Sequence, residues 1–286
     1  MRSLLFVPGD SERKLAKAFD AAADVVIFDL EDAVAAERKE TARKLTREAA
    51  TDAPGRVAVR VNALDTGMTD ADLAAVMPAR PHFIVLPKSE TGADVAHLAA
   101  MLAVHEAEAG IEDGATKVIA IATETARALF GLGTYDAAGR RLAGLSWGLE
   151  DLSAALGVAR TRRADGRVTE VFAMARTLCL AGARAAGALP LDTVYTDFRD
   201  EDGLAREARE AAADGFLGKL AIHPSQVAVI NEAFTPTGGE VAEAERIVAA
   251  FAAEPGAGVV ALDGRMLDRP HLKNAEMLLA RARSTG

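Results

Sequence analysis

Short apolar runs rich in β-branched residues alternate along the chain with alanine-rich stretches of helical character. A parallel strand that is buried on both faces reads as a nearly continuous apolar run, and a crossover helix fills the segment between two such strands. Segments such as Glu12–Ala22 and Asp94–Ala109 are long enough for that helix. Eight apolar runs are present: Ser3–Pro8, Val25–Asp32, Val57–Asn62, His82–Lys88, Lys117–Glu124, Gly144–Asp151, Thr193–Asp197 and Lys219–Pro224. Eight β-then-α units predict an α/β protein with a closed (β/α)8 TIM barrel, and a doubly wound open sheet is the alternative.

The C-terminal part of the chain does not continue this alternation. After the eighth run come a helical stretch at Glu240–Ala253, the breaker Pro255-Gly256, a short apolar stretch GVVALDG and a last helix from about Pro270. No Pro/Ser-rich linker divides the chain. We therefore expect a barrel over residues 1–235 and a C-terminal helical extension over residues 236–286.

Polar residues stand where the apolar runs end. Active sites of (β/α)8 barrels lie at the carboxyl ends of the strands. Glu124 and Asp151 end the fifth and sixth runs, so they are expected to converge on one hard cation. Magnesium favours oxygen ligands and takes one or two protein carboxylates, with water and substrate completing its shell. For Asp29, Asp32 or Glu150 taken singly, a helix cap or a loop charge is an equally good interpretation.

Alternation along the strands refines the expected cavity wall. Arg60 shares a face with Ala58 and Asn62, and Glu124 shares a face with Ala120 and Ala122. Small residues beside a charged one suit a cavity wall, so we expect these faces to point into the site.

Composition excludes several other classes. The 286 residues carry a net charge of −9 with scattered basic residues, which disfavours nucleic acid and anionic membranes as partners. No apolar run reaches the ~20 residues of a membrane span, and the run before Pro8 is too short for a signal peptide, so a cytoplasmic protein is expected. The single Cys179 cannot form an internal disulfide. The sequence contains no GxGxxG, P-loop or GxSxG motif and no histidine pair with metal-ligand spacing.

Eight motifs occur in the order of a known family and span nearly the whole chain. They are RSLLFVPG at 2–9, DLEDAV at 29–34, RVN at 60–62, PK at 87–88, ET at 124–125, GLEDL at 148–152, GKLAIHPSQV at 218–227 and DGRMLDRPHLKNA at 263–275. With these motifs the chain resembles the citrate lyase beta subunit and its relatives, the malyl-CoA and citramalyl-CoA lyases of the HpcH/HpaI aldolase superfamily.

The resemblance implies roles for particular residues. It implies a Mg2+ ion held by Glu124 and Asp151, Arg60 in contact with substrate oxygen atoms, and Glu31 and Asp32 supporting the site from outside the ligand shell. In relatives the C-terminal segment reaches over a neighbouring subunit and supplies a catalytic aspartate, which would be Asp268 here. The simpler interpretation of Asp268 is the N-cap of the last helix, and the two interpretations are compatible. The resemblance also implies a homotrimer or homohexamer.

The implied activity is a magnesium-dependent carbon–carbon lyase of retro-Claisen or retro-aldol type. A short 3-hydroxy-acid acyl thioester of citryl, malyl or citramalyl type would yield a 2-oxo acid and an acetyl thioester. Arg60 would stabilise developing negative charge, and Asp268 would act as the acid/base. Lys88 is expected to bind substrate. Arg13 and Lys14, with Lys17 nearby, would meet the phosphates of coenzyme A, unless they form only a solvated helix face.

Three questions stay open at this point. The protein could be a metal-dependent aldolase that cleaves a free hydroxy-oxo acid, or a subunit of a lyase complex that is inactive alone. The acyl group could be attached to coenzyme A or to an acyl-carrier protein. The oxo acid could be glyoxylate, pyruvate or oxaloacetate, which differ by one small substituent.

Overall fold

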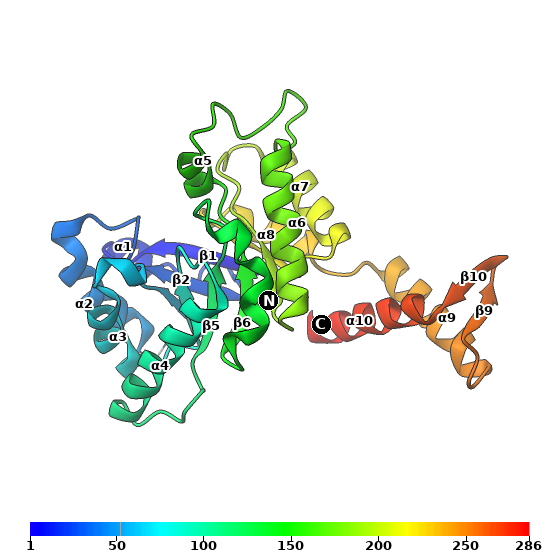
Figure 1. Ribbon diagram of the computed structural model, residues 1–286, viewed down its shortest axis with the longest axis horizontal. Coiled ribbons are helices and arrows are strands. Elements are labelled where there is room, and N and C mark those ends of the chain that lie inside the picture. The colour runs from blue at the N-terminus through cyan, green and yellow to red at the C-terminus, as the bar shows by residue number, and fades with distance from the viewer. Residues whose placement is uncertain (52, 286) are drawn as a thin grey trace. The chain divides into compact units, whose positions relative to one another are not determined.

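A closed barrel of eight parallel strands forms the larger part of the structure, a computed structural model that describes residues 1–51 and 53–285. Neighbouring strands pair in chain order, and β1 closes the barrel against β8 with Leu4 opposite Leu220. Figure 1 shows helices such as α2, α4 and α6 outside the strands. The strands are β1 (Ser3–Pro8), β2 (Val25–Asp29), β3 (Val57–Arg60), β4 (Phe83–Leu86), β5 (Lys117–Ile121), β6 (Leu142–Ser146), β7 (Leu189–Asp192) and β8 (Gly218–Ala221). The predicted (β/α)8 barrel is confirmed.

Two of the expected strands were misplaced. The sixth expected run, Gly144–Asp151, belongs to β6 only as far as Ser146, and Asp151 lies in the first turn of helix α5. The seventh strand lies before Thr193–Asp197, because Leu189–Asp192 pairs with both neighbours. Pro190 lacks the N–H of a ladder residue and so hides this strand, whereas the β-branched and aromatic residues that follow it have the stronger β-propensity.

The sequence signals of the helices in the barrel unit differ in how well they predict where each helix begins and ends. Thr91 and Asp94 form a capping box that fixes the start of α4. The expected first helix over Glu12–Ala22 is much shorter, because α1 ends at Leu15 and the chain continues in turns. The helices are α1 (Glu12–Leu15), α2 (Lys39–Ala50), α3 (Thr69–Val76), α4 (Gly92–Glu108), α5 (Glu150–Leu156), α6 (Glu170–Ala185), α7 (Glu201–Asp214) and α8 (Gln226–Ala233).

The barrel interior is filled by apolar side chains from strands all around it, including Leu4, Ile27, Ala58 and Leu220. On β3 the expected facing is right, since Ala58 belongs to this core and Arg60 lines the cavity above it. On β5 the expected facing is wrong, because Ile119 and Ile121 point inward and the alanines point toward the helices. Glu124 nevertheless lines the cavity, because β5 ends at Ile121 and the alternation stops there.

An ionic layer lies outside the barrel wall, between strands β7 and β8 and the covering helices. Lys219 Nζ donates to Asp192 Oδ2 at 2.6 Å, and both side chains are completely buried. Glu207 on α7 accepts from the same ammonium at 2.9 Å. Asp192 also accepts from Trp147 Nε1 at 2.7 Å. These contacts satisfy each buried charge and hold the Trp147 indole in place.

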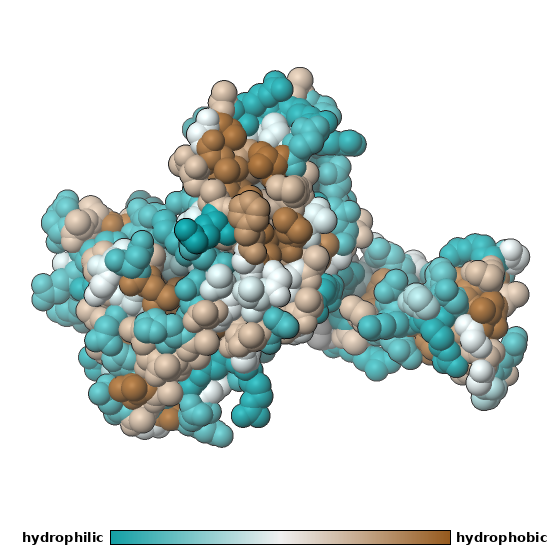
Figure 2. Space-filling model, in the orientation of Figure 1, coloured by the Kyte–Doolittle hydropathy of each residue, from teal (hydrophilic) through white to brown (hydrophobic). Residues whose placement is uncertain are grey.

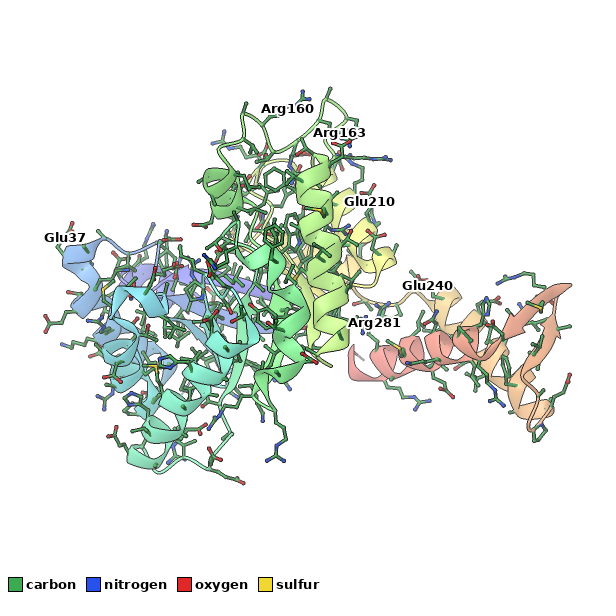
Figure 3. The ribbon with its side chains drawn as sticks, in the orientation of Figure 1. Glu37, Arg160, Arg163, Glu210, Glu240 and Arg281 are labelled. Carbon is green, nitrogen blue, oxygen red and sulfur yellow. The ribbon has the colours of Figure 1, made fainter. Side chains whose placement is uncertain are left out.

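The surface of the barrel unit combines scattered charge with exposed apolar side chains. Figure 3 shows Glu37, Arg163 and Glu210 projecting outward from different elements. Figure 2 shows apolar surface beside α5 and α6, and Met174 and Leu178 on α6 are exposed. None of the described helices is long and apolar enough to cross a bilayer.

The barrel unit ends at Asn231, and a second compact unit begins at Glu232, close to the expected boundary at 235. It contains α9 (Gly238–Ala253), β9 (Val259–Leu262), β10 (Arg265–Asp268) and α10 (Arg269–Thr285). The two expected helices are present, but the β9–β10 hairpin between them was not expected. Asp263 and Gly264 form its two-residue turn with φ of 52° and 75°, as an Asp-Gly pair favours.

We predict that Asp192→Ala lowers the free energy of unfolding by roughly 3–5 kcal/mol, because it leaves the Lys219 ammonium buried without its nearest counter-ion. Urea unfolding measures the difference. Asp214→Ala is the control, since Asp214 pairs with Arg176 at an exposed position and its loss should cost about 1 kcal/mol or less. Equal effects of the two substitutions would contradict this account of the layer.

Candidate active site

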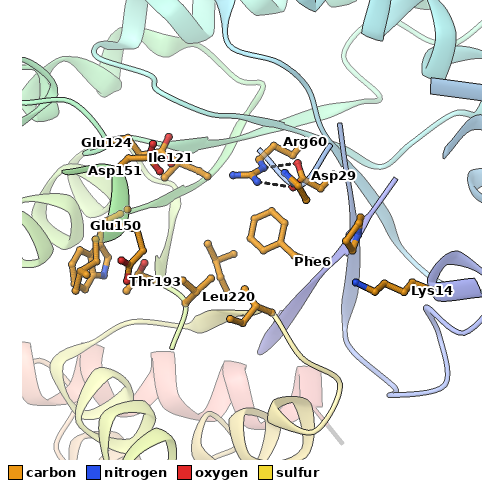
Figure 4. Close-up of a pocket in the computed structure, with 17 residues that line it drawn as sticks. Phe6, Lys14, Asp29, Arg60, Ile121, Glu124, Glu150, Asp151, Thr193 and Leu220 are labelled. Atoms are coloured by element: carbon orange, nitrogen blue, oxygen red, sulfur yellow. Dashed lines mark hydrogen bonds and ion pairs between the residues drawn. The ribbon is translucent and has the colours of Figure 1, made fainter. Parts of the chain in front are cut away.

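A cavity of about 300 Å3 opens at the carboxyl ends of the barrel strands. Asp29 and Arg60 end β2 and β3, and Glu124 follows β5. Trp147, Thr193 and Ile222 follow β6, β7 and β8. Figure 4 shows that Glu124 and Asp151 lie on one side of the cavity and Arg60 with Asp29 on another. Different strands thus bring together side chains that are far apart in the sequence.

Arg60 is held rigidly at the edge of the cavity. Its Nε donates to Asp29 Oδ1 at 2.7 Å and its Nη2 donates to Asp29 Oδ2 at 2.6 Å. Its Nη1 lies 3.0 Å from Glu31 Oε2, and its guanidinium stacks over the Phe6 ring at 4.8 Å. Burial lowers the pKa of Arg60, but the bonds and charges of Asp29 and Glu31 outweigh it and raise the pKa above its ordinary value. The guanidinium is therefore a fixed, permanent cation.

Lys88 connects four segments of the site. Its backbone N–H donates to Glu124 Oε2 at 2.5 Å. Its Nζ lies 2.5 Å from Glu31 Oε1 and 3.5 Å from both Asp32 and Asp151. The residue has a φ of 51°, which is the left-handed region that a lysine rarely adopts. This backbone conformation costs about 1–3 kcal/mol, and such strain persists where the surrounding contacts fix it.

Glu124 is the buried carboxyl group of the site, with 5% of its surface exposed. Its pKa is raised to about 8, mainly by burial and in part by the charges of Glu31 and Asp151, while the backbone hydrogen bond from Lys88 opposes the rise. Gly148 packs against it so closely that a Cβ there would lie 2.5 Å from Glu124 Cγ. The glycine therefore makes room for this carboxyl group between β5 and β6.

The balance of charge favours a bound cation. Five carboxyl groups, Asp29, Glu31, Asp32, Glu124 and Asp151, share two cations, Arg60 and Lys88. Glu31 Oε2 is buried without a hydrogen bond, although it lies in an ion pair with Arg60. Among the described residues no three His, Cys, Asp or Glu side chains form a complete ligand set. Two carboxylates open to water and substrate suit Mg2+, which keeps several such ligands.

The structure gathers most of the residues singled out from the sequence. Arg60, Glu124 and Asp151 line the cavity, and Glu31, Asp32 and Lys88 are joined to them by ion pairs. Lys14 reaches the cavity from α1. Asp268 belongs to the second unit, where its Oδ1 lies 2.5 Å from His271 Nδ1. Its catalytic role stays a prediction.

A second cavity of about 290 Å3 adjoins the first, and Phe6, Pro8, Lys14 and Ile222 line both. Arg13, Lys14 and Lys17 line its basic side. His223 and Pro224 line it from the segment after β8, with Phe198 stacked on the His223 ring at 5.0 Å between centroids. The lining of this cavity combines cations with the His223 ring, which stacks on Phe198 behind it.

Several residues that shape the site were not found from the sequence. Phe6 and Trp147 form parts of its wall, and their apolar character marks them only as core. Lys39 Nζ donates to the carbonyl oxygens of Leu30 and Glu31 at 2.6 and 2.8 Å. Lys39 also donates to Asn62 Oδ1 at 2.7 Å, so it fixes the segment that carries Glu31. No local sequence signal distinguishes this lysine from a solvated one.

Comparisons with known proteins agree with this geometry. The sequence model of the HpcH/HpaI aldolase/citrate lyase family matches residues 2–224. A citrate lyase subunit beta-like protein of Mycobacterium tuberculosis (strain ATCC 25618 / H37Rv) is 41% identical over 278 residues, which cover 97% of this chain and 94% of that protein. A (3S)-malyl-CoA thioesterase of Cereibacter sphaeroides (strain KD131 / KCTC 12085) is 38% identical over 98% of this chain and 94% of its own length.

A crystal structure matches the fold over almost the whole chain. It is that of the protein CitE from Mycobacterium tuberculosis in complex with magnesium, acetoacetate and coenzyme A. The TM-score is 0.81 at 39% sequence identity, and the match covers 99% of this chain and 98% of that one.

We predict a pH dependence of stability that originates in Glu124. The folded, metal-free protein keeps the Glu124 proton up to a pH of about 8, whereas the unfolded chain releases it near the ordinary value of 4.5. The folded state therefore binds more protons between these values, and the contribution of Glu124 to the free energy of unfolding falls as pH rises through this window. The slope is at most about 1.4 kcal/mol per pH unit.

Urea unfolding in EDTA between pH 4.5 and 8 measures this slope, and Glu124→Gln should remove that part of it. Glu150→Gln is the matched control, because Glu150 lines the same cavity at an exposed position. Identical slopes for the wild type and Glu124→Gln would show that Glu124 is ionised in the metal-free protein.

Proposed function

Because the chain belongs to the HpcH/HpaI aldolase/citrate lyase family, we propose that it is a magnesium-dependent carbon–carbon lyase acting on a 3-hydroxy-acid acyl thioester. Its products would be a 2-oxo acid and an acetyl thioester. The observation that carries this proposal is the pair Glu124 and Asp151 in one cavity with the fixed guanidinium of Arg60. This arrangement offers oxygen ligands for a cation and a donor for an oxyanion.

Glu124 and Asp151 are the residues that would hold the metal. A bound Mg2+ ion supplies Lewis-acid polarisation of the substrate oxygens that it contacts. Glu124 would have to lose its proton to act as a ligand, and a bound cation would then balance its negative charge in the buried site. Lys88 lies beside both carboxylates and fixes their spacing through its backbone N–H and its ammonium.

Arg60 is the group suited to the negative charge of the substrate. In the cleavage, the substrate hydroxyl would give its proton to water. The bond between C2, next to the thioester carbonyl, and C3, which bears the hydroxyl, would break, and the electron pair of that bond would remain on the thioester half as an enolate. Asp29 holds Arg60 with two hydrogen bonds, so the guanidinium need not reorganise as charge develops. Phe6 excludes water from one face of the guanidinium and strengthens its field.

Glu31 and Asp32 act by holding these cations rather than by touching substrate. Glu31 bridges Arg60 and Lys88, and Asp32 lies 3.5 Å from Lys88 and 4.0 Å from Arg60. Burial raises the pKa of Glu31, and the two cations oppose that shift. Removal of Glu31 would take one ion-pair partner from each of these cations.

The second cavity suits the thiol-bearing carrier of the acyl group, such as coenzyme A. Arg13, Lys14 and Lys17 offer charge to phosphates, and the stacked Phe198 and His223 rings offer a flat apolar surface nearby. The M. tuberculosis CitE structure contains coenzyme A, and this likeness supports a coenzyme A thioester here. Lys14 lines both cavities and would lie where the carrier is joined to the acyl group.

Asp268 is the proposed acid that returns a proton to the enolate carbon. In this proposal it comes from a neighbouring copy of the chain within a homotrimer or homohexamer. The exposed apolar side chains of Met174 and Leu178 on α6, and of Phe130, give the barrel unit surface that association would bury.

A second candidate function is hydrolysis of the thioester, because one relative is named a malyl-CoA thioesterase. Hydrolysis would release free coenzyme A and the intact hydroxy acid, whereas carbon–carbon cleavage releases an oxo acid. Product analysis therefore separates the two functions.

We predict that the isolated protein with Mg2+ cleaves at least one of malyl-CoA, citramalyl-CoA and citryl-CoA to an oxo acid. Oxo acid and acetyl-CoA would be quantified together with free coenzyme A. EDTA should abolish the activity, and Asp151→Asn should lower kcat/KM by at least about a hundredfold. Asp165→Asn, in an exposed loop, is the control. Release of coenzyme A without oxo acid would favour the hydrolase.

We predict that Asp268→Asn and Asp151→Asn, each inactive alone, restore activity when they are mixed. If a site combines the barrel of one copy with the tail of another, random 1:1 exchange yields about a quarter of the wild-type sites. Activity would be measured after subunit exchange. Full activity of Asp268→Asn alone would remove this aspartate from the mechanism, and an inactive mixture would place both residues in one chain.

A further inference from the structure

The wall of the active-site cavity is divided into a charged arc and an apolar arc. Going round the barrel, the ends of β2 and β3 and the segments after β4, β5 and β6 carry the carboxylates, Arg60 and Lys88. The largely apolar arc runs from the end of β6 to β1 and contains Trp147, Val194, Leu220, Ile222 and Phe6, together with the polar Thr193. Figure 4 shows Leu220 across the cavity from Arg60, whereas the Phe6 ring lies next to the guanidinium.

Each cation of the charged arc lies in ion pairs with carboxylates of the same arc. Arg60 is bound by Asp29 and Glu31, and Lys88 by Glu31, Asp32 and Asp151. Among the described residues that line the cavity, the cations are Arg60 and Lys14. Lys14 is exposed and lies on the rim that the second cavity shares, where an ion pair contributes little.

This distribution provides for one carboxylate of the oxo-acid half of a substrate. Arg60, together with a cation at Glu124 and Asp151, can neutralise that group. A second carboxylate on the same half would face either the carboxylate-rich arc or the apolar arc. The first position adds repulsion between like charges, and the second removes water from an ion without a counter-charge.

We infer that the cavity selects a thioester whose oxo-acid half carries one carboxylate and a small uncharged substituent, hydrogen or methyl. Thioesters whose oxo-acid half carries a second carboxylate are rejected. The inference rests on the proposed lyase function and specifies its substrate class. A hydrocarbon substituent suits Leu220, Val194 and Ile222, which would cover it.

The test compares kcat/KM for malyl-CoA, citramalyl-CoA and citryl-CoA under one set of conditions with saturating Mg2+. The better of the first two should exceed citryl-CoA by at least about fiftyfold, because the discrimination involves an uncompensated charge and not one methylene. A smaller ratio, or a preference for citryl-CoA, would overturn the inference and leave the lyase function intact.

Absence of cleavage for all three thioesters would count against the proposed function instead. The inference would then be decided by equilibrium binding of the free oxo acids in the presence of Mg2+, measured by calorimetry. Glyoxylate or pyruvate should bind at least about thirtyfold more tightly than oxaloacetate. Oxaloacetate binding of equal or greater strength would overturn the inference.

A charge placed in the apolar arc gives an independent check. Ile222 is partly exposed at the rim, so Ile222→Lys can be accommodated without burying the ammonium. In this variant, the ratio of kcat/KM for the better of malyl-CoA and citramalyl-CoA to kcat/KM for citryl-CoA should fall by at least about tenfold. In the binding measurement, the ratio of affinities for glyoxylate or pyruvate and for oxaloacetate should fall by the same factor. Ile222→Met is the matched control and should keep the wild-type ratio. An unchanged ratio in Ile222→Lys would mean that charge in this arc does not determine the selection.

Discussion

Excess negative charge at the carboxyl end of the barrel is the constraint on which the site depends. Five carboxyl groups are assembled around Arg60 and Lys88, and Glu124 is almost completely removed from water. Carboxylates in such a place must be paired, protonated or bound to a cation. The surrounding segments provide the paired cations and the space that these carboxyl groups require. Asp29 and Glu31 orient Arg60, Lys88 takes a strained backbone conformation to reach four segments, and Gly148 gives room to Glu124.

The fold could be predicted from the sequence because a barrel repeats one simple unit eight times. Errors arose where a local signal conflicts with the tertiary pairing. Pro190 concealed β7, since its lack of an N–H argues against a strand, yet its carbonyl still accepts from Leu217. The facing of Ala120 and Ala122 was misjudged, because alternation was extended from Glu124 across the point where β5 ends. The Asp263-Gly264 pair was a hairpin signal that the sequence analysis overlooked.

The candidate site was predictable to a different extent. Charged residues at strand ends could be found because chemistry at this face requires them, and Arg60, Glu124 and Asp151 do line one cavity. Residues that act through packing or through the backbone could not. Phe6 under Arg60 has the same pattern as any core residue, and the bonds of Lys39 to two carbonyl oxygens depend on where distant segments meet. The proposed role of Asp268 depends on association, which the fold of one chain does not define.

The Trp147 indole connects the outer ionic layer with the cavity. Its Nε1 donates to Asp192 outside the barrel wall, while the residue itself lines the cavity within. Replacement of the Asp192–Lys219 pair by apolar residues, as a way to raise thermal stability, would therefore also remove the hydrogen bond that holds Trp147 in the cavity wall. Substitutions made to stabilise this ionic layer would also change the cavity wall, so stability and ligand binding must be measured together.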